Sequence, residues 1–296
     1  MATVTKRTIK GITYYYLQQT LRANGKFEHK SKYLGREIPK DIKRIKSQFE
    51  LEINKEKWFD RFDAIKKNHR REFTKLPTSV KDKRLRQFSI TFTYNTQRIE
   101  GSTLTLSETA QLIEEGISPS GKPRSDVEEA EAHNRLFLAM LKEKRDLTLP
   151  LVMEWNYELL KDTKPDVAGQ IRRYGIGISG SEFVPPTPVE LQPMLRDFFK
   201  WYSGHKGNTH AVELAALVHL KFVTIHPFGD GNGRVSRLMM NHVLNKNGYP
   251  MLNIEYKNRN SYYRALERSQ VNRQDTTFAN WLFRRYLQEY KRYEAA

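Results

Sequence analysis

The feature that most constrains this fold is the helical spacing of apolar residues along the last two thirds of the chain. From Lys81 onward, apolar side chains recur every three or four positions, which is the repeat of one helix face and not of a strand. The chain has 296 residues, enough to bury a sizeable core. We therefore predict a mainly α-helical bundle, with helical stretches at 107–115, 127–141, 149–160, 191–202, 212–225, 235–245, 262–266 and 278–290.

One segment interrupts the helical pattern. Residues 174–186 read YGIGISGSEFVPP, so small and apolar residues alternate and the segment ends in two prolines. Glycine and proline at this density disfavour a helix. We expect an extended loop or a short β-hairpin inserted among the helices.

The first 90 residues have a different character. Residues 12–17 and 27–33 are rich in β-branched and aromatic residues, and Asn24-Gly25 lies between them. Asn-Gly tolerates positive φ and is a strong hairpin signal. From Asp41, apolar residues every three to five positions indicate a helix, and Pro77 is the next breaker. We predict a module over 1–90, with a β-hairpin at about 8–34 and then a helix, and a second domain over 91–296.

The charge of the chain is concentrated in that module. Lys and Arg number 51 against 34 Asp and Glu, a net charge of +17. Residues 1–90 hold 24 of the basic and 10 of the acidic residues, which leaves 27 and 24 for the rest. Cysteine is absent, which excludes disulfides, thiolate metal sites and a cysteine nucleophile. No stretch is apolar enough for a membrane span or a signal peptide, so we expect a soluble, cytoplasmic protein.

Basic and aromatic residues alternate closely near the N-terminus, a composition compatible with nucleic-acid binding. The alternative is a solvated charged face on a module that recruits a protein target or packs on the core. We favour this alternative, because no known nucleic-acid-binding signature is recognisable. The residues concerned are Lys6, Arg7, Lys10, Arg22, Lys26, Lys30 and Lys32 with Tyr14, Tyr15, Tyr16, Phe27 and Tyr33.

The most informative segment is HPFGDGNGRVSR, residues 226–237, which lies between two helical stretches. A glycine-rich loop that leads into a helix presents free backbone N–H groups and the positive end of the helix dipole. Arg234 and Arg237 are three residues apart, so both can face an anion at this loop. Asp230 offers a carboxylate suited to Mg²⁺, and His226 is the candidate general base. Phe228 is expected in the core.

This segment matches the pattern HPFx(D/E)GNGRxxR at every specified position, and the chain resembles Fic proteins of the AMP-transferring type from about residue 90 to residue 290. The related Doc kinases have lysine at the position of Gly233, which argues against that branch. The resemblance implies that His226 deprotonates a Ser, Thr or Tyr hydroxyl of a target protein, which attacks the α-phosphate of ATP. Asp230 would hold Mg²⁺. The implied phosphate contacts are Gly231, Asn232, Gly233, Arg234 and Arg237.

A second Fic signature lies upstream, where residues 96–101 match the inhibitory pattern (S/T)xxxE(G/N). Thr96 and Glu100 are four residues apart and share a helix face, and Gly101 is suited to end that helix. The resemblance implies an inhibitory helix at about 90–101, whose Glu100 pairs with Arg237 and occupies the space of the γ-phosphate. The implied enzyme is autoinhibited. In some Fic proteins this glutamate is instead described as orienting the water that removes AMP, which leaves a deAMPylase as the alternative.

The resemblance also gives residues 175–186 a role, as a flap that pairs its backbone with the target. The flap side chains expected at that edge are Ile176, Ile178, Phe183 and Val184. Tyr263 resembles an adenine contact of the family. Relatives often have asparagine seven residues further on, where this chain has Gln270, and that departure puts the choice of base in doubt. Family members commonly label themselves, so self-modification is expected.

Overall fold

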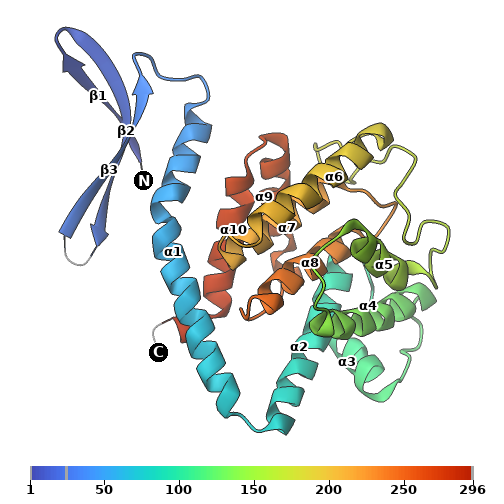
Figure 1. Cartoon of the computed structure of the whole chain (residues 1–296). Coiled ribbons are helices and arrows are strands. Elements are labelled where there is room, and N and C mark those ends of the chain that lie inside the picture. The colour runs from blue at the N-terminus through green and yellow to red at the C-terminus, as the bar shows by residue number, and fades with distance from the viewer. Residues whose placement is uncertain (1, 24–25, 295–296) are drawn as a thin grey trace. The chain divides into compact units, whose positions relative to one another are not determined.

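The computed structural model describes residues 2–23 and 26–294, which form two compact units, Met1–Asp63 and Ala64–Ala296. Helix α1 (Ile42–Lys75) contributes to both units (Figure 1). The boundary falls inside this helix and not near residue 90. Its last turns belong to the second unit, where Asn68 donates to the carbonyl of Tyr293 at 2.9 Å and His69 packs edge-on against Tyr290.

The first unit contains an antiparallel sheet in the order β1 (Thr3–Ile9), β2 (Ile12–Ala23), β3 (Lys26–Gly35). The predicted hairpin corresponds to β2 and β3, and its expected turn at Asn24-Gly25 lies outside the described residues. Strand β1 was not predicted, because its residues are mostly exposed and lack a regular apolar alternation. It joins β2 through Lys10 and Gly11, both at positive φ, the backbone that a two-residue hairpin turn requires.

The two faces of this sheet differ in composition. Leu17 is buried with Ala2 and Phe49 of α1, and Lys32 is its cross-strand partner on that face. On the opposite face, the Tyr16 ring lies 5.3 Å from the Tyr33 ring, and the Arg7 guanidinium lies 5.1 Å from the Tyr16 ring. Because successive strand residues point to opposite faces, Lys32 lies on the face of Leu17, whereas Arg7 lies on the face of Tyr16 and Tyr33.

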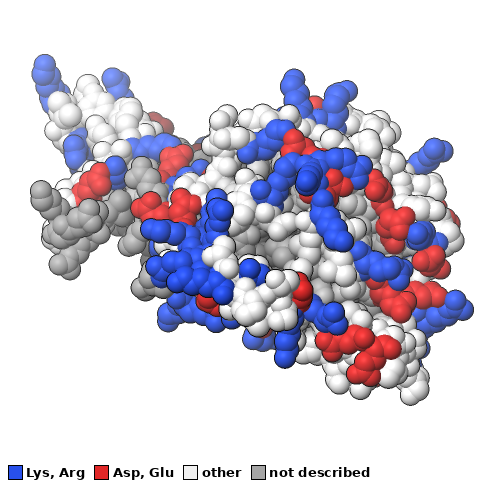
Figure 2. All heavy atoms as spheres, turned by 60° about the horizontal axis from the view of Figure 1, so that its bottom comes forward, with Lys and Arg blue, Asp and Glu red and all other residues white. Residues whose placement is uncertain are grey.

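The second unit is helical, which confirms the mainly α prediction. After the shared α1, its helices are α2 (Thr78–Ile99), α3 (Leu106–Glu115), α4 (Arg124–Lys142), α5 (Leu149–Leu160), α6 (Pro188–His205), α7 (Ala211–Ile225), α8 (Asn232–Lys246), α9 (Arg259–Val271) and α10 (Asp275–Glu289). None of the described helices is both long and apolar enough to cross a membrane. On the side seen in Figure 2, Lys and Arg are interspersed with Asp and Glu over this unit.

Helices α7 and α8 form the centre of this unit, and nearly all of their residues are buried. Helix α7 is apolar around most of its circumference, and such a helix is stable only inside a core. Half of the buried residues of α8 are polar or charged, among them Arg234 and Arg237. The pair packs against α10 and α6 on the side of α7 and against α4, α5 and α2 on the side of α8 (Figure 1). The loop between α7 and α8 is therefore held between two buried helices.

The predicted β-hairpin at the flap does not form. Within the described residues 174–187 no strand is present, and the nearest ladder contact is an isolated bridge between Ile171 and Phe228. The three glycines of this segment have no side chains to pack across a ladder, and its two prolines have no N–H to donate. The segment is a loop, called here the 174–186 loop.

Candidate active site

The loop between α7 and α8 is fixed by its own residues. His226 ends α7 in the left-handed region, at φ 51° and ψ 57°, and Gly231 precedes α8 at φ 80°. The buried side chain of Asn232 accepts from the backbone N–H of Phe228 at 3.0 Å and donates to its carbonyl at 2.9 Å. The amide of Asn232 thus closes the loop, and the phosphate contact expected of this residue stays a prediction.

His226 is oriented by a backbone bond. Its Nδ1 lies 3.2 Å from the carbonyl of Val223, and since a carbonyl only accepts, the neutral ring carries its proton on Nδ1. Burial lowers the pKa of His226 below 6.5, although the Val223 bond and the charge of Glu100 partly oppose this. The ring is therefore neutral near pH 7, and its Nε2 is free to accept a proton.

A cavity of about 570 Å³ brings residues of four segments together. The predicted site residues that line it are Glu100, Ile178, His226, Gly233, Arg237 and Tyr263. Of the other expected flap residues, Ile176, Phe183 and Val184 do not line this cavity, and Val184 is 79% exposed. Its volume is in the range of small-molecule sites.

The Glu100 carboxylate and the Arg237 guanidinium form an ion pair in this cavity, at 2.5 Å between Oε1 and Nη2. Arg237 is only 1% exposed, and it also donates to the Oγ1 and the carbonyl of Thr96, at 3.3 Å each. The hydroxyl of Tyr262 accepts from Nη1 at 3.2 Å. The end of α2 is thus joined to the first turns of α8.

The same carboxylate lies directly over the N-terminal turn of α8. A Cβ built on Gly233 would stand 2.3 Å from Oε1 of Glu100, so only glycine leaves room for this contact. Glu100 follows the last residue of α2, and Gly101 turns the chain away at φ 104°. Helix N-termini attract anions, and here the anion is a side chain of the chain itself.

Arg234 does not line this cavity. It is 2% exposed and forms an ion pair with Glu129 of α4. It also lies 3.1 Å from Oδ1 of Asp230 and donates to Oε1 of Gln97 at 3.3 Å. The guanidinium of Arg234 is thus engaged by three side chains, and the phosphate contact expected of it stays a prediction.

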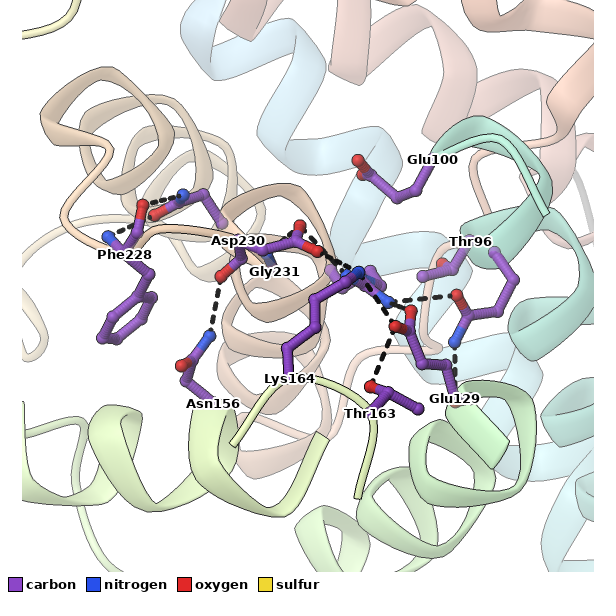
Figure 3. A network of polar contacts seen from close by, with 12 residues as sticks. Thr96, Glu100, Glu129, Asn156, Thr163, Lys164, Phe228, Asp230 and Gly231 are labelled. Carbon is purple, nitrogen blue, oxygen red and sulfur yellow. Dashed lines mark hydrogen bonds and ion pairs between the residues drawn. The ribbon is translucent and has the colours of Figure 1, made fainter. Parts of the chain in front are cut away.

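Lys164 completes this second network, shown in Figure 3. Its Nζ lies 2.5 Å from Oδ2 of Asp230 and 3.0 Å from Oε1 of Glu129. Burial raises the pKa of Asp230, but the charges of Arg234 and Lys164 outweigh it and lower that pKa to about 2. Asp230 is thus ionised throughout the physiological range.

The residues present fit a magnesium ion that is shared with phosphates. In the described part of the chain, no group of three or more His, Asp or Glu side chains could hold a metal alone. Asp230 supplies one hard oxygen, and Mg²⁺ is usually held by one or two carboxylates together with phosphates and water. In this structure the ammonium of Lys164 provides a positive charge next to Oδ2 of Asp230.

Several residues of the site were not found from the sequence. Glu129, Lys164 and Asn156, which donates to the carbonyl of Asp230 at 2.9 Å, come from other parts of the chain. Arg172 lies just before the 174–186 loop and donates to the carbonyl of His226 at 2.8 Å. No local pattern marks these positions, because their roles arise only where distant segments meet.

Tyr263 lines the cavity and contacts the end of α2, while its expected contact with adenine stays a prediction. Its hydroxyl donates to the carbonyl of Ile99, the last residue of α2, at 2.8 Å. Gln270, at the position where relatives have asparagine, donates to Oγ1 of Thr224 at 3.3 Å. Both residues line the cavity, and Tyr263 also ties α9 to the segment that carries Glu100.

The helical unit and its glycine-rich loop define the class of protein. Residues 146–244 match the model of the Fic/DOC family. The chain therefore contains a Fic/DOC domain. This confirms the family resemblance.

Individual relatives agree with this assignment. The chain is 36% identical over 178 residues to "Protein adenylyltransferase Fic" of Drosophila yakuba, an alignment covering 59% of this chain and 36% of that protein. It is similar to a Fic domain-containing signaling protein of Bacteroides thetaiotaomicron, with a TM-score of 0.70 and 27% identity over 78% of this chain and 96% of that one. It is also similar to Fic-1 of C. elegans, with a TM-score of 0.69 and 25% identity. That alignment covers 85% of this chain and 74% of the other. The chain spans about a third of the length of the curated relatives it matches.

Proposed function

We propose that this protein is an autoinhibited protein adenylyltransferase that moves AMP from ATP to a hydroxyl side chain of a target protein, its own chain included. Support comes from the Fic/DOC domain and from relatives named as adenylyltransferases. The observation that carries the proposal is the meeting of His226, Arg237 and Glu100 in one cavity at the N-terminus of α8.

In the proposed reaction, Nε2 of His226 takes the proton of the target hydroxyl. The hydroxyl oxygen forms a bond to the α-phosphorus, the bond from that phosphorus to the bridging oxygen breaks, and pyrophosphate leaves with the electron pair. The lowered pKa of His226 keeps the ring neutral and able to accept a proton. The fixed Nδ1 contact with Val223 keeps Nε2 as the accepting atom.

The phosphates would lie at the first turn of α8, beside Gly233 and the guanidinium of Arg237. The amide of Gly231, the other amide expected there, donates to Oδ1 of Asp230 at 2.5 Å. Mg²⁺, bound at Asp230, would supply positive charge to the phosphates. Arg234 is engaged with Glu129 and Asp230, so its contribution is to hold Asp230 ionised and in place. A change in this pairing would be needed before Arg234 could reach a phosphate.

The inhibition would arise from Glu100. Its carboxylate uses the arginine and the helix N-terminus that a terminal phosphate would require. An anion in that position repels a phosphate and occupies its volume. ATP would therefore bind with its phosphates displaced from the geometry for transfer.

The first prediction is that Glu100→Gly increases labelling with AMP. Removal of one charge-assisted contact that competes with the phosphate should raise self-labelling about tenfold or more. The measurement is mass spectrometry of the intact protein after incubation with ATP and Mg²⁺, scored as a mass increase of one AMP group. The Glu100→Gly, His226→Ala double variant is the control and should stay unlabelled. Equal labelling of Glu100→Gly and wild type would contradict the inhibitory role.

A deAMPylase is the alternative, and the common cavity of Glu100 and His226 supports considering it. There Glu100 would orient water towards a modified hydroxyl. Glu100→Gly protein that has labelled itself can be mixed with wild-type protein and Mg²⁺ after removal of ATP. Release of free AMP that requires Glu100 would favour removal, whereas stable label would favour transfer.

A further inference from the structure

A single buried arginine connects the 174–186 loop to His226. Arg172 is 4% exposed, and its guanidinium donates to three carbonyls. Nε reaches His226 at 2.8 Å, Nη1 reaches Tyr174 at 2.8 Å and Nη2 reaches Pro186 at 2.5 Å. Its own N–H donates to the carbonyl of Pro227 at 2.9 Å.

The charge of Arg172 is not used in an ion pair. Among the described residues, no carboxylate lies within ion-pairing distance of it. Burial accordingly lowers the pKa of Arg172. A buried cation is costly unless its donors are satisfied, and here backbone carbonyls alone satisfy them. The planar guanidinium presents several N–H donors in a fixed geometry. This geometry, and not the charge, is what the three carbonyls use.

The first of the three carbonyls belongs to the base. His226 is a non-glycine residue at positive φ, a backbone state that persists only where its surroundings hold it. The Nε bond of Arg172 fixes the peptide plane that follows this residue. Together with the Val223 contact of the ring, it sets the direction in which the imidazole faces.

The other two carbonyls mark the two ends of the loop. Between Tyr174 and Pro186, the N–H of Ser181 donates to the carbonyl of Ile178, and the N–H of Phe183 donates to Oγ of Ser181. Ser181 and Glu182 also donate to the carboxylate of Glu267 of α9. The loop lacks a strand partner of its own. Glu267 holds the middle of the loop, and the guanidinium of Arg172 joins both of its ends to the carbonyl of His226.

We propose that Arg172 is a positioning residue, which holds the 174–186 loop in register with His226 so that a target segment docked on the loop presents its hydroxyl to Nε2. This rests on the proposed transferase function. The guanidinium binds both the 174–186 loop and the backbone of His226, so it fixes the position of the loop relative to the base. Arg172 does not line the cavity that contains Gly233 and Arg237, so we expect its replacement to change nucleotide affinity little.

The test compares Arg172→Lys and Arg172→Gln with the control Arg173→Ala, all in the Glu100→Gly background. Arg173 is the exposed neighbour in the sequence. We expect labelling of a Ser-, Thr- or Tyr-containing target peptide to fall about tenfold or more, with affinity for a non-hydrolysable ATP analogue within twofold of the parent. Lysine should rescue little, because one ammonium cannot span three carbonyls. Arg173→Ala should behave as the parent.

Two further measurements test the contacts of Arg172 without relying on enzyme activity. Amide hydrogen exchange of 175–185 should be faster in Arg172→Lys than in the parent, with no change in α7. In the unsubstituted protein, the nuclear magnetic resonance signal of the Arg172 Nε–H should exchange with water far more slowly than that of Arg173, a measurement that holds even where the variants fail to fold.

The outcomes separate the two proposals. Unchanged labelling and unchanged loop exchange in Arg172→Lys, or a lower melting temperature as its only effect, would overturn the positioning role. Fast exchange of the Arg172 Nε–H would overturn it as well. A Glu100→Gly parent that transfers no AMP would contradict the proposed function, while loop exchange would still report whether Arg172 holds the loop.

Discussion

At Asp230, two cations already neutralise one carboxylate. Arg234 is buried beneath it, whereas Lys164 approaches from the outer side and keeps 41% of its side chain exposed. With Glu129, the four side chains balance two positive against two negative charges. A divalent cation at Asp230 would add positive charge to these four side chains, whose charges already cancel. Lys164 is partly exposed, so its ammonium can move away from Asp230 into solvent.

We therefore predict that Lys164→Ala strengthens Mg²⁺ binding. Removal of a competing cation at Asp230 should lower the Mg²⁺ concentration for half-saturation about tenfold, in Glu100→Gly protein loaded with a non-hydrolysable ATP analogue. Isothermal titration with MgCl₂ measures it directly. Lys161→Ala, which removes a surface partner of Glu158, is the matched control. Weaker Mg²⁺ binding in Lys164→Ala would indicate that Lys164 instead assists the phosphates.

At the scale of elements, the end of α2 is held by contacts from α8 and α9. Arg237 binds the carbonyl of Thr96, and the hydroxyl of Tyr263 binds the carbonyl of Ile99. Both carbonyls belong to the last turn of α2, where helices lack internal partners. The position of Glu100 thus depends on how firmly this turn is docked.

Tyr263→Phe tests this dependence. Loss of one hydrogen bond, worth about 1 kcal/mol, should loosen the turn and raise self-labelling of the otherwise unchanged protein several-fold. In the Glu100→Gly background the same substitution should leave ATP affinity unchanged. Tyr157→Phe, on the surface of α5, is the control. A rise in the KM for ATP without extra labelling would instead support the adenine contact predicted from the sequence.

The elements differ in how well the sequence predicts them. Long stretches with helical spacing became α3 to α10, and the motif around His226 located the junction of α7 and α8, since both signals are local. The flap hairpin was wrong, because alternation of small and apolar residues does not supply a pairing partner. Arg172 and Lys164 were missed, because the contacts that give them a role, with His226, Glu129 and Asp230, are made with residues dozens of positions away.

At the scale of the whole molecule, buried histidines should make stability depend on pH. Burial is the main cause that lowers their pKa, to about 3 for His133, where the charges of Arg237 and Arg234 add to it. In the unfolded chain these rings titrate near 6.5. The residues are His69, His133, His219, His226 and His242.

The sign follows from proton binding. Below pH 6.5 the unfolded chain binds protons that the folded chain excludes, so the free energy of unfolding should fall as the pH decreases. Each fully shifted histidine contributes up to about 1.4 kcal/mol per pH unit. Urea unfolding at pH 7.5, 6.5 and 5.5 measures this slope, and exposed His205→Gln is the control. A free energy that is constant from pH 7.5 to 5.5 would contradict the buried, neutral state of these rings.

The N-terminal unit carries much of the excess positive charge of the chain. Residues 1–63 contain 15 Lys and Arg against 8 Asp and Glu. The sheet places Tyr14, Tyr16 and Tyr33 with Arg7 on one face and Lys32 on the other. Arg7 lies over the ring of Tyr16, and Lys6 is the cross-strand partner of Tyr15. Basic and aromatic residues thus share each face, as a surface that combines stacking with phosphate contacts requires. The nucleic-acid interpretation and the protein-recruitment alternative both stay predictions for this unit.

The pairing of Glu100 with Arg237 has a consequence for how the proposed enzyme could be controlled. The carboxylate is a competitor tethered to its own binding site, so its local concentration is set by the chain and does not fall on dilution. Neither the amount of protein nor its expression level would then release the activity. Control would have to come from a molecule that pulls the last turn of α2 away, and the natural place to look for such a molecule is the outer surface of that turn.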